Sequence, residues 1–383
     1  MTIPLPAGNA PASASPQLPV PIPSEPVQFP ANWILDHAAP PIQHRAITEI
    51  AKLSTAGLPR LATLTYGYRP ALTLALTQRH DGTWAGGMLT APPAKAENFA
   101  GVGTINAVRR LSEYGWEQES PPLLHARRTL FRLLAEDEDP GYLFELAPKG
   151  KFDPDMARHG RLILREASAA ALAQMGYEKD PRLRGAARRI VERLDNYLRS
   201  PAAEKPFVRA GNQHVLAPGA FPPSYHTLVM LSHMPLFRSE HYDVMERLYN
   251  YLSQPRPRAE PVALVGKKAV TLTHVVMGDP LPHRNAADAD IPFALAWLEL
   301  AARLQFLRRH DGWLKMFERF IDDRDRDGVW RAPKASSALR SGDPLVWPTW
   351  PLEHTPTEES RWSDATFRLG LIARLAGRPI QLI

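Results

Sequence analysis

Aromatic and acidic side chains gather in a short stretch near the end of the chain. Trp347, Trp350 and Trp362 lie close in sequence to Glu353 and His354. Tryptophan rings can stack on sugar rings or shield a cation, and a pair of carboxylates is what glycoside hydrolysis requires. The stretch therefore predicts the mouth of a ligand site, with a proline-rich loop of packed tryptophan rings as the alternative.

Three carboxylates at alternate positions, Asp323, Asp325 and Asp327, precede Gly328. Oxygen ligands at this spacing can wrap a hard cation such as calcium, as in the first half of an EF-hand loop. The twelfth position of such a loop is Lys334, where a bidentate glutamate is needed. We expect either a weak calcium site or a polar turn at the end of a helix, and no other cofactor.

Histidines are scattered through the middle of the chain, and His226 is the one that we assign to a ligand site. The sequence lacks the spacings of a zinc protease, a nucleophile elbow and a phosphate-binding loop. Because the chain has no cysteine, disulfides, thiolate nucleophiles and thiolate metal sites are excluded. The formal charge of +6 is spread along the chain, which argues against a nucleic-acid partner.

The chain has 39 prolines in 383 residues, which excludes long coiled coils and large parallel sheets. Its first 30 residues consist mainly of proline, alanine and serine, a composition that cannot repay the entropy of ordering. We predict a disordered arm over residues 1–38 and a single domain over residues 39–383.

Within that domain, apolar residues recur three and four positions apart, which is typical of helices. Pairs of helices are predicted on either side of turns at Gly115, Gly176 and Gly312. The first helix of each pair is the more apolar, so we expect an inner and an outer helical layer in an all-α fold. Strand-like alternation is limited to Ala269–Val276.

A loose internal repeat supports this architecture. Five segments share an arginine- and leucine-rich helix, a polar turn, and a glycine or proline followed by an apolar residue. They recur at intervals of 55 to 68 residues and end at Trp84, Leu143, Phe207, Val262 and Trp330.

The first of these segments, residues 69–84, resembles the Gln-Trp repeat of squalene and hopene cyclases and of the wider prenyltransferase-like α/α-toroid group. The positions that match this repeat are Arg69, Leu74, Gln78, Gly82 and Trp84. The last segment retains Gly328 and Trp330, with Asp325 where glutamine is expected. The resemblance implies an α/α toroid of about five helix pairs around a central ligand cavity. A different α/α barrel and an open solenoid are the alternatives.

Asp288 and Asp290 precede a predicted apolar helix and resemble the acid motif of class II terpenoid cyclases. That resemblance implies that Asp290 protonates an alkene or epoxide, with Asp288 as its partner. The final aspartate of the motif is replaced by Ile291. The alternative is that one of the two carboxylates caps the helix.

These features predict a toroid protein that binds or transforms a hydrophobic, isoprenoid-like ligand. Whether it is an enzyme stays open. A glycan-acting barrel that uses Asp288, Glu353 or Glu358 is one alternative, and a non-catalytic helical scaffold is another. No apolar run is long enough to be a transmembrane segment, although peripheral membrane contact stays open. The absence of a visible signal peptide favours a cytoplasmic location.

Overall fold

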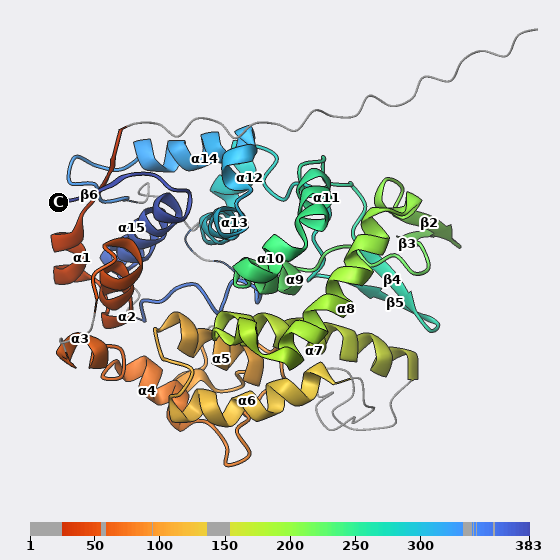
Figure 1. Ribbon diagram of the computed structural model, residues 1–383, viewed down its shortest axis with the longest axis horizontal. Coiled ribbons are helices and arrows are strands. Elements are labelled where there is room, and N and C mark those ends of the chain that lie inside the picture. The colour runs from red at the N-terminus through yellow and green to blue at the C-terminus, as the bar shows by residue number, and fades with distance from the viewer. Residues whose placement is uncertain are drawn as a thin grey trace, which may run out of the picture.

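A computed structural model of the chain describes residues 25–54, 59–93, 95–135, 154–331, 339, 341, 343–354 and 357–383. Over these residues the protein is mostly helical, with short strands in three two-stranded sheets (Figure 1). The prediction of a helical domain is confirmed. The strands are an addition to it, and only one of them, at Lys268–Thr271, overlaps a segment in which alternation predicted a strand.

The longer helices carry most of the fold, and short ones connect them. In chain order they are α1 (Ala31–His37), α2 (Pro40–Arg45), α3 (Pro59–Thr63), α4 (Arg69–Leu76), α5 (Thr104–Glu113), α6 (Pro121–Leu134), α7 (Pro154–Gln174), α8 (Pro181–Leu198), α9 (Tyr225–Ser232), α10 (Pro235–Glu240), α11 (Tyr242–Leu252), α12 (Arg284–Ala289), α13 (Ile291–Arg303), α14 (Asp311–Asp322) and α15 (Glu358–Leu375). None of the described helices combines the length and the apolar character needed to cross a bilayer.

The end of the predicted arm is ordered, while residues 1–24 lie outside the described residues. β1 (Val27–Phe29) pairs in parallel with β6 (Ile380–Leu382), and α1 follows directly. The ring of Phe29 lies against Gly370 of α15, where a Cβ atom would come within 2.5 Å of it. The prediction of disorder is therefore wrong for residues 27–37, because their apolar side chains pack on a helix from the far end of the sequence.

The first two predicted helix pairs are α5 with α6 and α7 with α8. Pro121 and Pro181 stand at the first helical position, where the missing N–H group is not needed. Asp180 caps α8 by accepting a hydrogen bond from the amide of Arg182 (2.9 Å). The predicted turn in the third pair is displaced, since Gly312 lies inside α14 and the chain reverses before it, at residues 304–310.

The first helix of each pair is the more buried one, as the sequence predicts. Nearly every residue of α5 and most of α13 are buried. α5, α7, α9, α13 and α15 contact one another in that order, and α6 and α8 pack against α5 and α7. α15 also packs against α1 and α2, which brings the two ends of the described chain together (Figure 1).

The turn after α4 is held in place by hydrogen bonds from Gln78 and Trp84. The side-chain amide of Gln78 donates to the carbonyl groups of Gly82 (3.0 Å) and Pro122 (2.8 Å), which ties the turn to the start of α6. Gly82 has a φ of 82°, and a Cβ atom there would lie 2.7 Å from a carbonyl oxygen of α6. Trp84 is buried, and its indole N–H donates to the carbonyl of Leu74 (2.9 Å).

A second turn, after α14, has the same backbone hydrogen bonds. The comparison of the two turns shows that one predicted residue match is wrong. The amide of Gly82 donates to the carbonyl of Arg79 (2.9 Å), and the amide of Gly328 donates to the carbonyl of Asp325 (3.0 Å). Arg79 and Asp325 are thus equivalent. The residue at the position of Gln78 is Arg324, so the predicted match with Asp325 is wrong by one position.

Two β-hairpins follow α8 and α11, where the repeat segments are least regular. They are β2 (Phe207–Ala210) with β3 (Gln213–Leu216), and β4 (Val262–Val265) with β5 (Lys268–Thr271). Phe207 and Val262, the last residues of two repeat segments, are the first residues of β2 and β4. A small apolar core forms beneath the hairpins, from Leu216, Leu272 and Met277.

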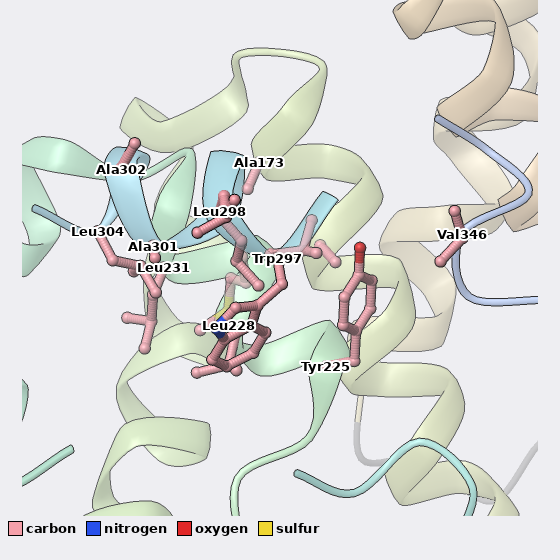
Figure 2. Close-up of a cluster of buried hydrophobic side chains, with 14 of the residues drawn as sticks. Ala173, Tyr225, Leu228, Leu231, Trp297, Leu298, Ala301, Ala302, Leu304 and Val346 are labelled. Carbon is pink, nitrogen blue, oxygen red and sulfur yellow. The ribbon is translucent and has the colours of Figure 1, made fainter. Parts of the chain in front are cut away.

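The main core lies between the helices, and Figure 2 shows part of it around α9 and α13. Trp297 is buried beside Leu228, and its ring meets that of Trp313 edge to face at 5.5 Å. Tyr225 stands at the edge of this cluster (Figure 2). The apolar core thus borders the charged side chains at the centre of the protein.

Candidate functional site

Charged side chains fill the place where α2, α5, α13 and α15 meet. The carboxylate of Glu113 accepts hydrogen bonds from Arg45 (2.5 Å) and Arg368 (2.8 Å), and Arg368 also donates to Glu299. These four residues are at most 7 % exposed. We call the whole set the central ion network, and its members are Arg45, Glu49, Glu113, Glu299, Arg303 and Arg368.

The central ion network keeps its carboxylates charged. Burial acts to raise the pKa of Glu113, but the guanidinium groups of Arg45 and Arg368 outweigh it and lower that pKa. The pKa of Glu299 is lowered against burial by Arg368 and Arg303. A buried charge is tolerated only when it is paired and hydrogen-bonded, so the network holds its helices together at neutral pH.

The centre therefore offers little room for a ligand. The cavity between α5, α9 and α13 measures about 30 Å³, enough for a group about the size of a water molecule. At this junction, the side chains of the described residues leave too little room for an isoprenoid-like ligand.

The two carboxylates assigned to acid catalysis have structural partners. Asp290 caps α13 by accepting a hydrogen bond from the amide of Phe293 (2.9 Å), and it also accepts one from the hydroxyl of Ser341 (2.9 Å). Asp288 pairs with Arg284 (3.2 Å) and Arg319 (2.7 Å). Asp290 is therefore a helix cap, as the alternative proposed. Asp288 is bound by two arginines.

The predicted calcium ligands do not converge. One carboxylate oxygen of Asp325 accepts the amides of Asp327 (3.0 Å) and Val329 (2.8 Å), and the other accepts from Arg331 (2.5 Å). The side chains of Asp323 and Asp327 are exposed. Among the described residues, no group of three or more acidic or histidine side chains is placed to hold a metal ion.

The predicted aromatic site is only partly assembled. The ring of Phe99 contacts Trp347 at 6.3 Å and the exposed His354 at 5.8 Å. Trp350 is buried, and its indole N–H donates to a backbone carbonyl (3.1 Å). Trp362 lies apart from these rings, beneath the guanidinium of Arg331 at 4.8 Å.

Glu353 is buried beside a second carboxylate, Asp364 of α15. Both oxygens of Asp364 accept backbone amides, from Leu352 (3.0 Å) and Glu353 (3.1 Å), and Glu353 accepts the amide of Ala39. Burial and the charge of Asp364 raise the pKa of Glu353 to about 8. These contacts fix a loop to the helices. The side chain of Glu358 is outside the described residues.

A larger cavity of about 430 Å³ lies between α7, α8 and the two hairpins, and we call it the hairpin pocket. Its walls are mainly apolar and come from both hairpins, from α7 and α8, and from the loop before α9. Among the apolar residues are Ile163, Leu194, Val215, Leu216, Leu264 and Leu272.

One side of the hairpin pocket carries hydrogen-bonding groups. The hydroxyl of Ser224 donates to Glu166 (2.6 Å), and Arg193 lies 3.3 Å from the other oxygen of the same carboxylate. Burial raises the pKa of Glu166, while the hydrogen bond from Ser224 and the charge of Arg193 oppose it. This polar group fixes one end of an otherwise apolar space.

Histidines complete the polar side. Burial lowers the pKa of His159, and burial together with His159 lowers the pKa of His274 to about 4. His226, the histidine that we assigned to a ligand site, does not line this pocket. It is buried behind His274, with ring centres 6.2 Å apart, and burial holds its pKa well below its ordinary value.

Sequence reasoning missed the residues that line the hairpin pocket. His159 and Glu166 are seven positions apart on α7, a spacing that places them on one helix face, and this was the available signal. Ser224 is the N-cap of α9, and this capping role alone explains a serine there. The sequence therefore gave no sign of its hydrogen bond to Glu166.

The chain was compared with protein-family models, with curated protein sequences and with solved structures, and none of the three comparisons gave a match.

Proposed function

We propose that the protein binds a predominantly apolar small molecule in the hairpin pocket. The observation that carries this proposal is the cavity of about 430 Å³ with apolar walls and polar groups on one side. Ligand sites commonly combine an apolar cleft with a few fixed polar groups. The proposal keeps the isoprenoid-like ligand class expected from the sequence and moves it from the centre to the hairpins.

The charges of the hairpin pocket favour a ligand with a neutral polar end. His159 and His274 have lowered pKa values and are uncharged at neutral pH. The charge of Arg193 faces Glu166. An alcohol can donate a hydrogen bond to Glu166, whereas a diphosphate would meet an acidic group in an apolar setting.

We further infer that the helices form an α/α toroid with inner and outer rings. The succession of contacts from α5 through α7, α9 and α13 to α15 supports this, as does the ion pair that joins Arg368 of α15 to Glu113 of α5. The two similar turns add support, since Trp84 and Trp330 each bond through their amide to a threonine of the next inner helix, at 3.1 and 3.0 Å.

Farnesol and farnesyl diphosphate, compared by isothermal titration calorimetry, test the proposed ligand class. We expect farnesol to bind and the diphosphate to bind at least tenfold more weakly. The variant Ala263→Phe places a ring in the pocket wall and should abolish farnesol binding, whereas Ala289→Phe, on an exposed residue of α12, should leave it unchanged. Equal binding by both variants, or tighter binding of the diphosphate, would refute the proposal.

A further inference from the structure

Arg109 of α5 has an unusual environment at the centre of the protein. It is 2 % exposed and lines the cavity of about 30 Å³. Its Nε atom donates to the side-chain oxygen of Gln174 (3.1 Å). Among the described residues, its two terminal NH₂ groups have no hydrogen-bond or ion-pair partner.

The carboxylates of the central ion network leave Arg109 without a charged partner. The central ion network contains the three carboxylates of Glu49, Glu113 and Glu299, and each is paired with Arg45, Arg303 or Arg368. Arg109 is thus a fourth guanidinium beside three carboxylates. An unpaired buried charge costs several kcal/mol, so a counter-ion at this place would be strongly favoured.

His233 and Tyr225, two titratable groups that line the cavity, add no charge to offset Arg109. Burial and the charge of Arg303 lower the pKa of His233 to about 4, and burial raises the pKa of Tyr225 to about 12, so both are neutral at pH 7. Burial and the charge of Asp290 raise the pKa of Asp343, a carboxylate near Tyr225 that does not line the cavity.

The free hydrogen-bonding groups at the cavity include a second donor. The hydroxyl of Tyr225 lines it and has no protein partner among the described residues. One N–H of Gln174 and the hydroxyls of Ser232 and Thr349 are already used, by Glu113 (2.7 Å) and by the carbonyls of Val229 (2.8 Å) and Val346 (3.0 Å). The guanidinium of Arg109 and the hydroxyl of Tyr225 line a small space in which their donors have no protein partner among the described residues.

We propose that this cavity binds one small monovalent anion, of the size of chloride or bromide, between Arg109 and Tyr225. The volume of about 30 Å³ is enough for one small ion. The anion would neutralise the excess guanidinium and so stabilise the junction of α5, α9 and α13. This site is separate from the hairpin pocket and does not depend on the function proposed for it.

The thermal midpoint in sodium chloride and in sodium gluconate, at equal ionic strength, tests the proposal. For the unmodified protein we expect chloride to raise the midpoint by several degrees, with saturation, because ligand that binds only the folded state stabilises it. Arg109→Met should lose this chloride-specific rise. Arg238→Met removes another buried arginine, one that does not line the cavity, and should keep it.

Anomalous diffraction from a crystal soaked in bromide gives an answer that needs no variant. A bromide peak within hydrogen-bond distance of Arg109 and Tyr225 would support the proposal even if Arg109→Met does not fold. Equal midpoints in the two salts, an unchanged chloride effect in Arg109→Met, or a cavity without a bromide peak would each overturn it.

Discussion

The centre of the protein and the hairpin pocket use the same residue types in opposite ways. At the centre, arginines and glutamates are packed against one another and leave about 30 Å³ free, whereas at the hairpins a single glutamate borders about 430 Å³ of mainly apolar space. At the centre, the paired side chains of opposite charge pack closely and fill the space between the helices. Where the chain forms a hairpin in place of a compact turn, it leaves an apolar cavity.

The largest effect that separates the two regions is expected from Arg368→Met. This change removes the guanidinium that pairs with both Glu113 and Glu299. Breaking a buried ion pair typically costs about 3–5 kcal/mol, and urea unfolding measures the loss. Arg158→Met is the control, because that side chain is 73 % exposed and its loss should cost less than about 1 kcal/mol. Similar costs for both variants would mean that the central ion network does not hold the fold together.

Acid should affect the buried histidines, His274 of the hairpin pocket and His233 of the central cavity, before it affects the carboxylates of the central ion network. Because the pKa of His274 is lowered to about 4, the folded protein resists a proton that the unfolded chain accepts below about pH 6.5. The stability that neutral His274 contributes is full above about pH 6.5 and is lost as the pH falls toward 4. Between pH 7 and pH 5 the loss from this group is about 2 kcal/mol. In the central ion network, the lowered pKa values of Glu113 and Glu299 delay the loss until the pH falls below the ordinary glutamate range.

Urea unfolding of His274→Gln at pH 7 and pH 5 checks the acid prediction. The difference in unfolding free energy between the two pH values should shrink by about 2 kcal/mol. An unchanged difference would assign the acid sensitivity to another group.

An added ring should be tolerated in the hairpin pocket and rejected in the core. Ala301 is 2 % exposed in the apolar cluster of Figure 2, so Ala301→Phe should cost about 1–3 kcal/mol through overpacking. Ala263 lines the hairpin pocket, and Ala263→Phe should change the unfolding free energy by less than about 1 kcal/mol. A large cost for Ala263→Phe would show that the pocket closes in solution.

The smallest effect is expected from Glu166→Gln. The amide oxygen can still accept the hydroxyl of Ser224, and only the ion pair with the partly exposed Arg193 is lost. The unfolding free energy should change by less than about 1 kcal/mol, while affinity for farnesol should change measurably by calorimetry. A loss of stability as large as that of Arg368→Met would place Glu166 in the structural framework instead.

Much of the helical framework was predictable because its signals are local. Proline at a first helical position, as at Pro121 and Pro181, and glycine at Gly82 each solve a backbone problem within a few residues. The polar turn predicted before Trp84 is therefore present, with Gly82 at a positive φ. The shift between Asp325 and Arg324 arose because acidic residues alternate there, so composition does not fix the register.

The filled centre was not predictable for a different reason. Arg109 and Arg368 are typical of exposed helix faces, and only tertiary structure shows that both are buried. The hairpins were missed because their strands have four residues each, too few for a reliable period of two. Both failures concern contacts between segments far apart in the sequence.

The parallel pairing of β1 with β6 has a consequence for the order of folding. Val27 pairs with Ile380, so this sheet closes a loop that includes every helix described above. Closing so long a loop is entropically costly, and two strands of three residues offer few bonds in return. We therefore expect this sheet to form last, once α15 has presented Gly370 to Phe29, and to open first when amide hydrogen exchange is followed in the native protein.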